Sequence, residues 1–412
     1  MLNDEQQIAL EKITHWLYHE KQNFFLLKGS AGTGKTFCIR ELSSRGGMYV
    51  YTAPTNKATK VISESVSTDG ESPTCMTIYS LLGLTMDTNE DIKVLKDSKR
   101  RIDLSMYTAI VVDEASMINK QLYEHIEMAA IKQNARFIFM GDPAQLNPVK
   151  EQASRVWEIG SNATLTKVMR HDNAILDTAL KIRAQVDERY PKVSLVSNND
   201  GTEGVWRLRR ADFEAAIKAD AQAGLFTEKN KSKIIAWRNR AVLKLNDIVR
   251  NTIFPNSPTW VPGDRVVFAS AIKGVDETVL ATIDDEGTVL EAVIEYVGNY
   301  KAWALKIQVD DSIEINASVI HTDSIATYKD DLERLRDAAK EDRSKWRSFW
   351  FLKEFFNDIR YAYAITAHRA QGSTYETAYV CWQDMLLNHN VNEAYRCLYV
   401  AATRPKKKLI FS

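Results

Sequence analysis

Short runs of consecutive apolar residues, separated by segments with helical periodicity, recur along the first 165 residues of the chain. These runs occupy residues 24–27, 48–51, 109–112 and 137–140. Strands of a parallel sheet that is covered on both faces are buried on both sides, so near-continuous apolar runs are typical of such a sheet. We therefore predict an α/β domain with a parallel sheet in this part of the chain.

Polar residues follow each apolar run, where the carboxyl edge of a parallel sheet would lie. After the first run, the chain fills the phosphate-binding pattern G-x-x-x-x-G-K-[ST] without a mismatch. Glycines let backbone N–H groups approach phosphate oxygens, Lys35 can reach the β and γ oxygens, and the Thr36 hydroxyl can hold Mg²⁺. We predict that this loop binds a nucleoside triphosphate, through Gly29, Ser30, Ala31, Gly32, Thr33, Gly34, Lys35 and Thr36.

Two further polar clusters have residue types suited to hydrolysis of that nucleotide. Asp113 and Glu114 follow the run at 109–112. An Asp at a strand end suits a role at Mg²⁺, and the adjacent Glu can orient and deprotonate an attacking water. Residues 141–148 end the next strand and can place the Gln145 amide between the γ-phosphate and a second ligand. The three clusters together indicate a hydrolase that moves something rather than a small-molecule kinase.

The rest of the chain departs from this rhythm and then returns to it. Residues 81–103 are polar, and alternation at 92–95 is compatible with a short inserted hairpin. The α/β pattern restarts at 231–250, whereas 253–325 is rich in strand patterns and predicts a small barrel.

A charged helix from about residue 328 leads into an aromatic stretch at 346–356. The spacing of its aromatic residues fits one helix face, so we predict that they pack into a core. These residues are Trp346, Trp350, Phe351, Phe355 and Phe356.

Length and composition set outer limits on the interpretation. At 412 residues the chain exceeds one ordinary core, so two or more domains are expected. The 54 basic and 54 acidic residues cancel, so binding to nucleic acid would need a local groove rather than bulk charge. Four separated cysteines without a C-x-x-C pair favour reduced thiols and argue against zinc. Without a signal peptide or a bilayer-length apolar run, we expect a cytosolic protein.

The ordered set of motifs resembles superfamily 1 helicases, specifically the RecD-like 5′-to-3′ branch (superfamily 1B), and most closely the phage Dda helicases. The resemblance covers essentially the whole chain. Motif I is 29–36, with motifs Ia, Ib, II and III at 53–58, 77–80, 113–114 and 141–148, motif IV at 165–170, a further block at 237–240 with 245–246, and motifs V and VI at 365–373 and 398–404. The family more often has His at Tyr79 and Thr at Arg238.

The resemblance implies roles for individual residues. The catalytic set would be Lys35, Glu114, Gln145, Arg170 and Arg404, with both arginines stabilising charge on the γ-phosphate. Gln6 would read adenine and Gly372 would also lie at the nucleotide, while Thr36 and Asp113 would hold Mg²⁺. Single-stranded DNA would contact Pro54, Thr55, Thr77, Asn239, Thr366 and His368.

The implied fold has two RecA-like P-loop domains with parallel sheets. Domain 1A would be 1–165 with a pin hairpin (domain 1B) inserted at 81–105; domain 2A would be 166–252 and 359–412; domain 2B would be an SH3-like β insertion with a helical extension at 253–358. The pin, at about 84–101, would split the duplex at the fork, and the SH3-like insertion would brace it.

The implied activity is that of a monomeric ATP- and Mg²⁺-dependent 5′-to-3′ DNA helicase acting on single-stranded and forked duplex DNA. Its setting would be the bacterial or phage-infected cytoplasm, with DNA replication or recombination as the process and replication or single-strand-binding proteins as candidate partners. Two alternatives remain open: a single-strand translocase that strips bound proteins, and a nucleotide-gated RNA-binding switch with little motor activity.

Overall fold

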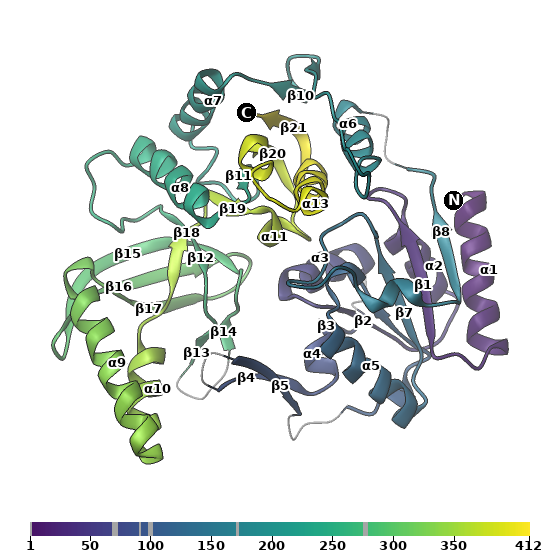
Figure 1. The fold of residues 1–412 in the computed structure, drawn as a ribbon, viewed down its shortest axis with the longest axis horizontal. Coiled ribbons are helices and arrows are strands. Elements are labelled where there is room, and N and C mark those ends of the chain that lie inside the picture. Colours follow the sequence, from purple (N-terminus) through teal and green to yellow (C-terminus); the bar gives the residue numbers. More distant parts are fainter. Residues whose placement is uncertain (1, 68–72, 90–91, 98–101, 170–172, 275–278) are drawn as a thin grey trace. The chain divides into compact units, whose positions relative to one another are not determined.

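The computed structural model describes residues 2–67, 73–89, 92–97, 102–169, 173–274 and 279–412 (Figure 1). The chain divides into two compact units. Unit 1 contains Met1–Arg207, Ala370–Thr374 and Trp382–Leu409, and unit 2 contains Leu208–Arg369, Tyr375–Cys381 and Ile410–Ser412.

Unit 1 is built on a six-stranded sheet with the strand order β3-β2-β6-β7-β1-β8. Its strands are β1 (Phe24–Gly29), β2 (Tyr49–Ala53), β3 (Cys75–Thr77), β6 (Ala109–Val112), β7 (Phe137–Gly141) and β8 (Asn162–Leu165). Every neighbouring pair in this sheet is parallel. The predicted parallel α/β sheet is therefore confirmed.

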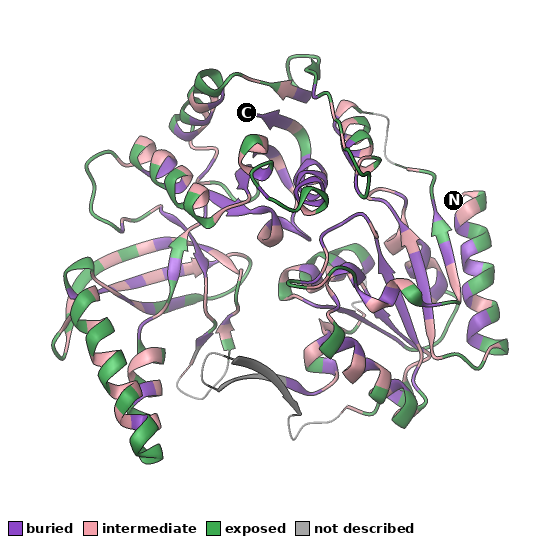
Figure 2. Ribbon diagram, in the orientation of Figure 1, coloured by how far each residue is buried: buried purple, intermediate pink, exposed green. Residues whose placement is uncertain are grey.

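Helices cover both faces of this sheet because alternate strand residues point to opposite sides. The helices are α1 (Asp4–His19), α2 (Lys35–Ser43), α3 (Asn56–Val66), α4 (Ile78–Leu81) and α5 (Lys120–Gln133). On one face, α1, α2 and α3 pack on a core that includes Leu27 and Val111. On the other, α4 and α5 pack on a core that includes Leu26 and Ile110. Figure 2 shows β2, β6 and β7 buried along their length.

Further elements of unit 1 lie outside this sheet. Strands β4 (Leu84–Asn89) and β5 (Ile92–Asp97) form an antiparallel pair in which Leu84 faces Asp97 and Asn89 faces Ile92. The predicted hairpin strands are thus present, and their role as a pin stays a prediction. The helices are α6 (Ala174–Arg183), α12 (Trp382–Met385) and α13 (Val391–Ala402), with 3₁₀ turns η1 (Leu104–Met106), η2 (Ala115–Met117) and η3 (Arg155–Glu158).

A second six-stranded sheet has the order β19-β11-β20-β21-β10-β9. Its strands are β9 (Asn198–Asn199), β10 (Gly204–Arg207), β11 (Ser232–Ala236), β19 (Ala364–Thr366), β20 (Tyr375–Val380) and β21 (Pro405–Phe411). The central strand β11 is parallel to both β19 and β20. Near it in sequence are α7 (Arg210–Gln222), α8 (Asn239–Ile253) and α11 (Ala367–Ala370).

Unit 2 contains an antiparallel five-stranded sheet with the order β17-β16-β15-β12-β18. Its strands are β12 (Arg265–Phe268), β15 (Glu286–Val297), β16 (Tyr300–Val309), β17 (Glu314–Ile320) and β18 (Ile359–Tyr361), beside the small pair β13 (Ile272–Lys273) and β14 (Val279–Ala281). Its core includes Phe268, Trp303 and Ile307. The β-rich character predicted for this region is confirmed, while its SH3-like identity stays a prediction.

A helical extension joins β17 to β18 through η4 (Thr322–Ser324), α9 (Ile325–Glu341), η5 (Arg343–Lys345) and α10 (Trp346–Phe355). Here the prediction of a packed aromatic face is wrong in part. Phe351 is 73% exposed and Phe355 38% exposed, whereas Phe349 and Phe356 are buried. These side chains stay exposed because α10 packs against α9, and Ala339 is the buried residue of α9. The two helices therefore form too small a core to bury more aromatic rings.

The compact units divide the chain differently from the predicted domain boundaries. Residues 166–207, together with α13, group with unit 1, because α6 packs against α13 and side chains of α13 bond to the first sheet's loops. The predicted RecA-like and inserted domains stay a prediction. All four cysteines are free thiols. None of the helices within the described ranges has both the length and the apolar character of a membrane span.

Candidate nucleotide site and nucleic-acid contacts

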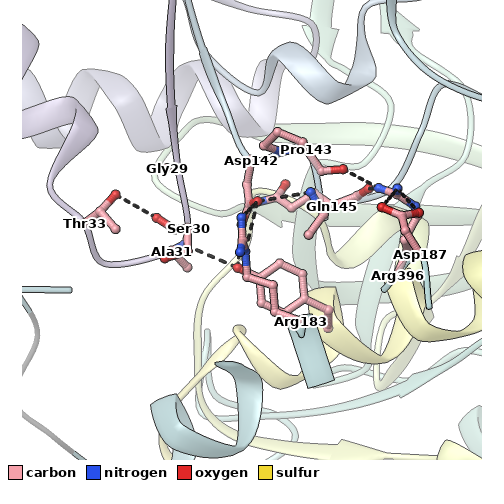
Figure 3. A network of polar contacts seen from close by, with 12 residues as sticks. Gly29, Ser30, Ala31, Thr33, Asp142, Pro143, Gln145, Arg183, Asp187 and Arg396 are labelled. Atoms are coloured by element: carbon pink, nitrogen blue, oxygen red, sulfur yellow. Dashed lines mark hydrogen bonds and ion pairs between the residues drawn. The ribbon is translucent and has the colours of Figure 1, made fainter. Parts of the chain in front are cut away.

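The loop between β1 and α2 contains Ser30, Ala31 and Thr33 (Figure 3) and two further glycines. Gly32 and Gly34 have φ values of 82° and 81°, a left-handed conformation that favours glycine. A Cβ added at Gly34 would lie 2.4 Å from the Gln6 Nε2 atom, and one at Gly29 would lie 2.5 Å from the Thr33 Oγ1 atom. The turn is closed by the Thr33 hydroxyl, which donates to the Ser30 carbonyl at 2.9 Å. Such a close-packed glycine loop at a helix N-terminus fits a bound phosphate.

Two side chains with predicted nucleotide roles are built into this loop. Lys35 Nζ donates to the carbonyl oxygens of Gly29 at 2.8 Å and Ser30 at 3.1 Å. Gln6 is buried, and its Nε2 donates to the Thr33 carbonyl at 3.1 Å while its Oε1 accepts from the Asn3 amide at 3.1 Å. The capping box that begins α1 therefore also fixes Gln6 against the loop.

The end of β6 carries the two predicted acidic residues. Asp113 Oδ1 accepts from the Glu114 amide at 2.8 Å. Burial and, after it, the Glu114 carboxylate raise the pKa of Asp113 to about 6, against the opposing effect of the Lys35 ammonium. The charges of Lys35 and Asp113 therefore influence each other across the phosphate-binding loop and the end of β6. Thr36 and Asp113 offer hydroxyl and carboxylate oxygens, the donor type that Mg²⁺ binds.

Glu114 itself has a strained backbone, with φ 50° and ψ 44°. A left-handed conformation costs free energy at a residue other than glycine and is concentrated at functional sites. The strain is consistent with a carboxylate held for a purpose rather than in an ordinary strand-end turn.

Gln371 was not predicted as a site residue, but it contacts two residues that were, Glu114 and Gln145. Gln371 Nε2 lies 3.0 Å from Gln145 Oε1, 3.0 Å from Ser116 Oγ and 3.4 Å from Glu114 Oε2. Gln145 is buried, with 6% of its surface exposed. The sequence offered one signal for Gln371, because it lies in the 365–373 block beside Gly372. Gly372 has φ 75°, and a Cβ added there would lie 3.5 Å from Ala58 Cβ.

A second network surrounds Asp142 in the loop that carries Gln145 (Figure 3). Arg183 of α6 binds the Asp142 carboxylate at 2.9 Å, and the Tyr399 hydroxyl of α13 donates to it at 2.5 Å. Arg396 of α13 donates to the Gln145 carbonyl at 2.7 Å and pairs with Asp187 at 2.7 Å. Of these residues, Asp142 and Tyr399 lie in the motifs at 141–148 and 398–404, whereas no sequence pattern indicated the two arginines or Asp187.

Two arginines, Arg170 and Arg404, are predicted to act at the γ-phosphate. Arg170 lies outside the described residues. Arg404 is buried, and its guanidinium donates to the carbonyls of Val400 at 2.9 Å and Ser373 at 3.1 Å and to the Thr403 hydroxyl at 2.7 Å. These contacts join the end of α13 to the 370–374 segment of unit 1.

The predicted DNA contacts of unit 1 lie at helix starts. Thr55 and Thr77 are the N-caps of α3 and α4, accepting from the amides of Ala58 at 3.2 Å and Ser80 at 3.1 Å. Pro54 is buried beside Thr55. Thr55 follows the parallel strand β2 and Thr77 is the last residue of the parallel strand β3, so both lie at the carboxyl edge of the sheet, where ligands of such sheets bind.

The predicted DNA contacts of unit 2 are Asn239, Thr366 and His368. Asn239 begins α8, Thr366 ends β19, and His368 lies on α11. Asn239 and Thr366 line one cavity of about 250 Å³ together with Trp260 and Tyr361. Two of the three are thus brought together around a partly aromatic cavity.

Comparison with known proteins finds similarity to two domain families and to a helicase. Residues 1–200 match the AAA domain family, and residues 361–412 match the UvrD-like helicase C-terminal domain family. The ATP-dependent DNA helicase dda of Enterobacteria phage T4 is 25% identical over 432 residues, which cover 95% of each chain. The chain thus resembles a DNA helicase over almost its whole length, and its two ends match an AAA domain and a helicase C-terminal domain.

One further protein and one solved structure are similar to the whole chain. An uncharacterized protein of Acanthamoeba polyphaga mimivirus is 24% identical over 496 residues, covering 100% of this chain and 99% of that protein. The Pif1 helicase from Bacteroides, solved in complex with ADP-AlF3 and ssDNA, has a TM-score of 0.53 at 15% identity and covers 100% of this chain and 92% of that one. This likeness establishes the shared fold.

Proposed function

We propose that the protein is an ATP-dependent DNA helicase that translocates 5′ to 3′ on single-stranded DNA. Hydrolysis would drive duplex unwinding and displacement of bound proteins. One observation carries the proposal: Gln371, from motif V, lies within 3.4 Å of Glu114 and 3.0 Å of Gln145, from motifs II and III. A side chain in a predicted DNA-contacting motif thus touches two side chains predicted to act on the nucleotide.

The residues of unit 1 divide the work of hydrolysis by their chemistry. Lys35 neutralises the β and γ oxygens, and Glu114 orients and deprotonates the attacking water. Thr36 and Asp113 would hold Mg²⁺, which screens phosphate charge when it is bound. Gln6 reads the base, and the arginines Arg170 and Arg404 stabilise the charge that develops on the transferred phosphoryl group.

Binding of DNA would use local contacts, because the chain has no net positive charge. Threonine hydroxyls and asparagine amides can bind phosphates, and His368 can stack on a base. Known relatives support this choice of ligand, since the T4 relative is named a DNA helicase and the Bacteroides Pif1 structure contains ssDNA.

The remaining assignments extend this proposal. The 5′-to-3′ direction, the two RecA-like domains with the pin and SH3-like insertions, and the monomeric state follow from the family resemblance. So do forked duplex DNA as substrate, replication or single-strand-binding proteins as partners, and the bacterial or phage-infected cytoplasm as location.

The first test is which nucleic acid stimulates the ATPase. We expect single-stranded DNA to raise the steady-state ATP turnover at least tenfold, and single-stranded RNA of the same sequence to raise it far less. Stimulation by RNA alone would replace the DNA helicase with a nucleotide-gated RNA-binding protein. Lys12→Ala, a substitution at an exposed position on α1, is the control variant, and its ATP turnover should match that of wild type.

A further inference from the structure

Tyr399 connects the phosphate-binding loop to the loop that carries Gln145. Its side chain is 1% exposed, and its hydroxyl donates to Asp142 Oδ2 at 2.5 Å. The same hydroxyl oxygen accepts from the Ala31 amide at 3.4 Å. Burial, and then the Asp142 carboxylate, raise the pKa of Tyr399, so the phenol keeps its proton and continues to donate to Asp142.

Asp142 also forms hydrogen bonds within its own loop, residues 141–148. Its Oδ1 accepts from the Ala144 amide at 3.1 Å, and its backbone carbonyl accepts from the Gln145 amide at 3.0 Å. Arg183 holds the carboxylate from the other side at 2.9 Å. The position of the Asp142 carboxylate therefore sets the turn that presents Gln145, which in turn contacts Gln371 at 3.0 Å.

We propose that Tyr399 is a positioning residue that makes the loop at 141–148 respond to occupation of the phosphate-binding loop. The inference rests on the proposed function, because it takes Ala31 as one of the amides that bind a nucleotide phosphate. That amide carries one hydrogen, which cannot serve the Tyr399 hydroxyl and a phosphate oxygen equally well. A phosphate that takes the hydrogen leaves the Tyr399 hydroxyl with its contacts to Asp142 and Arg183, which changes the support of the turn before Gln145.

The proposal predicts opposite signs for binding and turnover in Tyr399→Phe. Without the hydroxyl, the Ala31 amide has no competitor, so nucleotide binding becomes tighter by about two- to fivefold, in the range of one hydrogen bond. The turn that presents Gln145 loses its link to the nucleotide, so the DNA-stimulated turnover falls by about tenfold. A hydroxyl with only a structural role would weaken binding and turnover together.

Tyr395→Phe is the matched control on the same helix. Tyr395 lies one turn before Tyr399, and its hydroxyl donates to the Pro191 carbonyl at 3.2 Å, outside the Asp142 network. Its loss removes a similar buried contact and should leave nucleotide affinity and turnover within about twofold of wild type.

Asp142→Asn and the double variant test whether the two residues act together. If Tyr399 acts through Asp142, the double variant lowers turnover no further than the more impaired single variant, since the effects of coupled residues do not add. Independent effects that multiply would place the action of Tyr399 elsewhere. Asp142→Asn also carries the test if Tyr399→Phe fails to fold, because it should lower turnover about tenfold without weakening nucleotide binding.

The experiment measures binding of a fluorescent ADP analogue and ATP turnover with single-stranded DNA, for wild type and each variant. Tighter ADP binding with slower turnover in Tyr399→Phe supports the proposal, whereas unchanged or weaker binding overturns it. Lys35→Ala tests the proposed function separately from the role of the Tyr399 hydroxyl. If Lys35→Ala still hydrolyses ATP, the proposed function fails, while the ADP titration of Tyr399→Phe still decides the role of the hydroxyl.

Discussion

At the scale of single residues, the site uses side chains that also hold the local backbone. Lys35 bonds to two carbonyls of its own loop, Gln6 completes a helix cap, and Thr55 caps α3. Glu114, in contrast, has a left-handed backbone with a φ of 50°. Substitutions here can therefore affect both loop geometry and chemistry, and each test needs a readout that separates the two.

Lys35→Ala is expected to lower ATP turnover by about a hundredfold or more, because it removes a charge that stabilises the transition state. The protein should stay folded, because the two lost hydrogen bonds lie in a loop rather than in the core. Turnover is measured with single-stranded DNA, and folding by circular dichroism. DNA-stimulated turnover within tenfold of wild type would contradict the assignment of this loop as the catalytic nucleotide site.

Arg404→Ala is expected to lower kcat by about a thousandfold with less than threefold change in ATP affinity, because its guanidinium stabilises charge that develops only in the transition state. Arg404→Lys keeps the charge but not the planar fork, so it should recover only part of the loss. Steady-state kinetics give kcat, and nucleotide titration gives the affinity. Weaker ATP binding at unchanged kcat would make Arg404 a ground-state contact.

At the scale of elements, the order of strands and helices follows from hydrophobic pattern, while the anchoring of α8 does not. Arg250 of α8 binds Asp264 through Nε at 2.8 Å, and Tyr363 also donates to that carboxylate at 2.9 Å. Asp264 is fully buried. This pair joins α8, which begins at Asn239, to the residues that precede β12.

Asp264→Ala is expected to destabilise the protein by about 3–5 kcal/mol, because it removes the carboxylate that neutralises the buried Arg250 guanidinium and leaves it only carbonyl acceptors. The matched control is Glu214→Gln, which breaks the exposed Glu214–Lys218 pair on α7 and should cost at most about 0.5 kcal/mol. Urea unfolding of the full chain measures both. Equal shifts for the two variants would show that the buried pair does not anchor α8.

The β4–β5 hairpin gives the second prediction at this scale. Replacing residues 85–100 with a short Gly-Ser linker should leave DNA-stimulated ATP turnover nearly intact, because Lys35, Glu114 and Gln145 all lie outside it. Unwinding of a 5′-tailed duplex should be lost, since a base-pair step of about 1.4 kcal/mol re-forms unless a wedge prevents it. Normal unwinding would make the hairpin a surface loop, and loss of ATP turnover would make it part of the DNA-binding core.

At the scale of the whole molecule, the sequence predicted what depends on local pattern. The parallel sheet, the phosphate-binding loop and the acidic pair after β6 were all predictable, because each is a short run of residues with a periodic or motif signature. The exposure of Phe351 was not predictable, because it depends on how few buried side chains α9 contributes to the core.

The side-chain contacts within the site could not be predicted from the sequence pattern either. Gln371 and Gln145 are 226 positions apart, and Tyr399 and Asp142 are 257 apart. Their contact is a consequence of tertiary packing, which no local periodicity encodes. Their roles, like those of the motif residues, stay predictions that the variants above test.

The central claim is that ATP hydrolysis drives movement along DNA in one direction. The direct test compares unwinding of duplexes that carry a single-stranded tail on the 5′ side or the 3′ side, with ATP and Mg²⁺ and with Lys35→Ala as the inactive control. We predict ATP-dependent strand separation of the 5′-tailed duplex and little or none of the 3′-tailed duplex. Equal unwinding without ATP, or unwinding of the 3′-tailed duplex alone, would contradict the account.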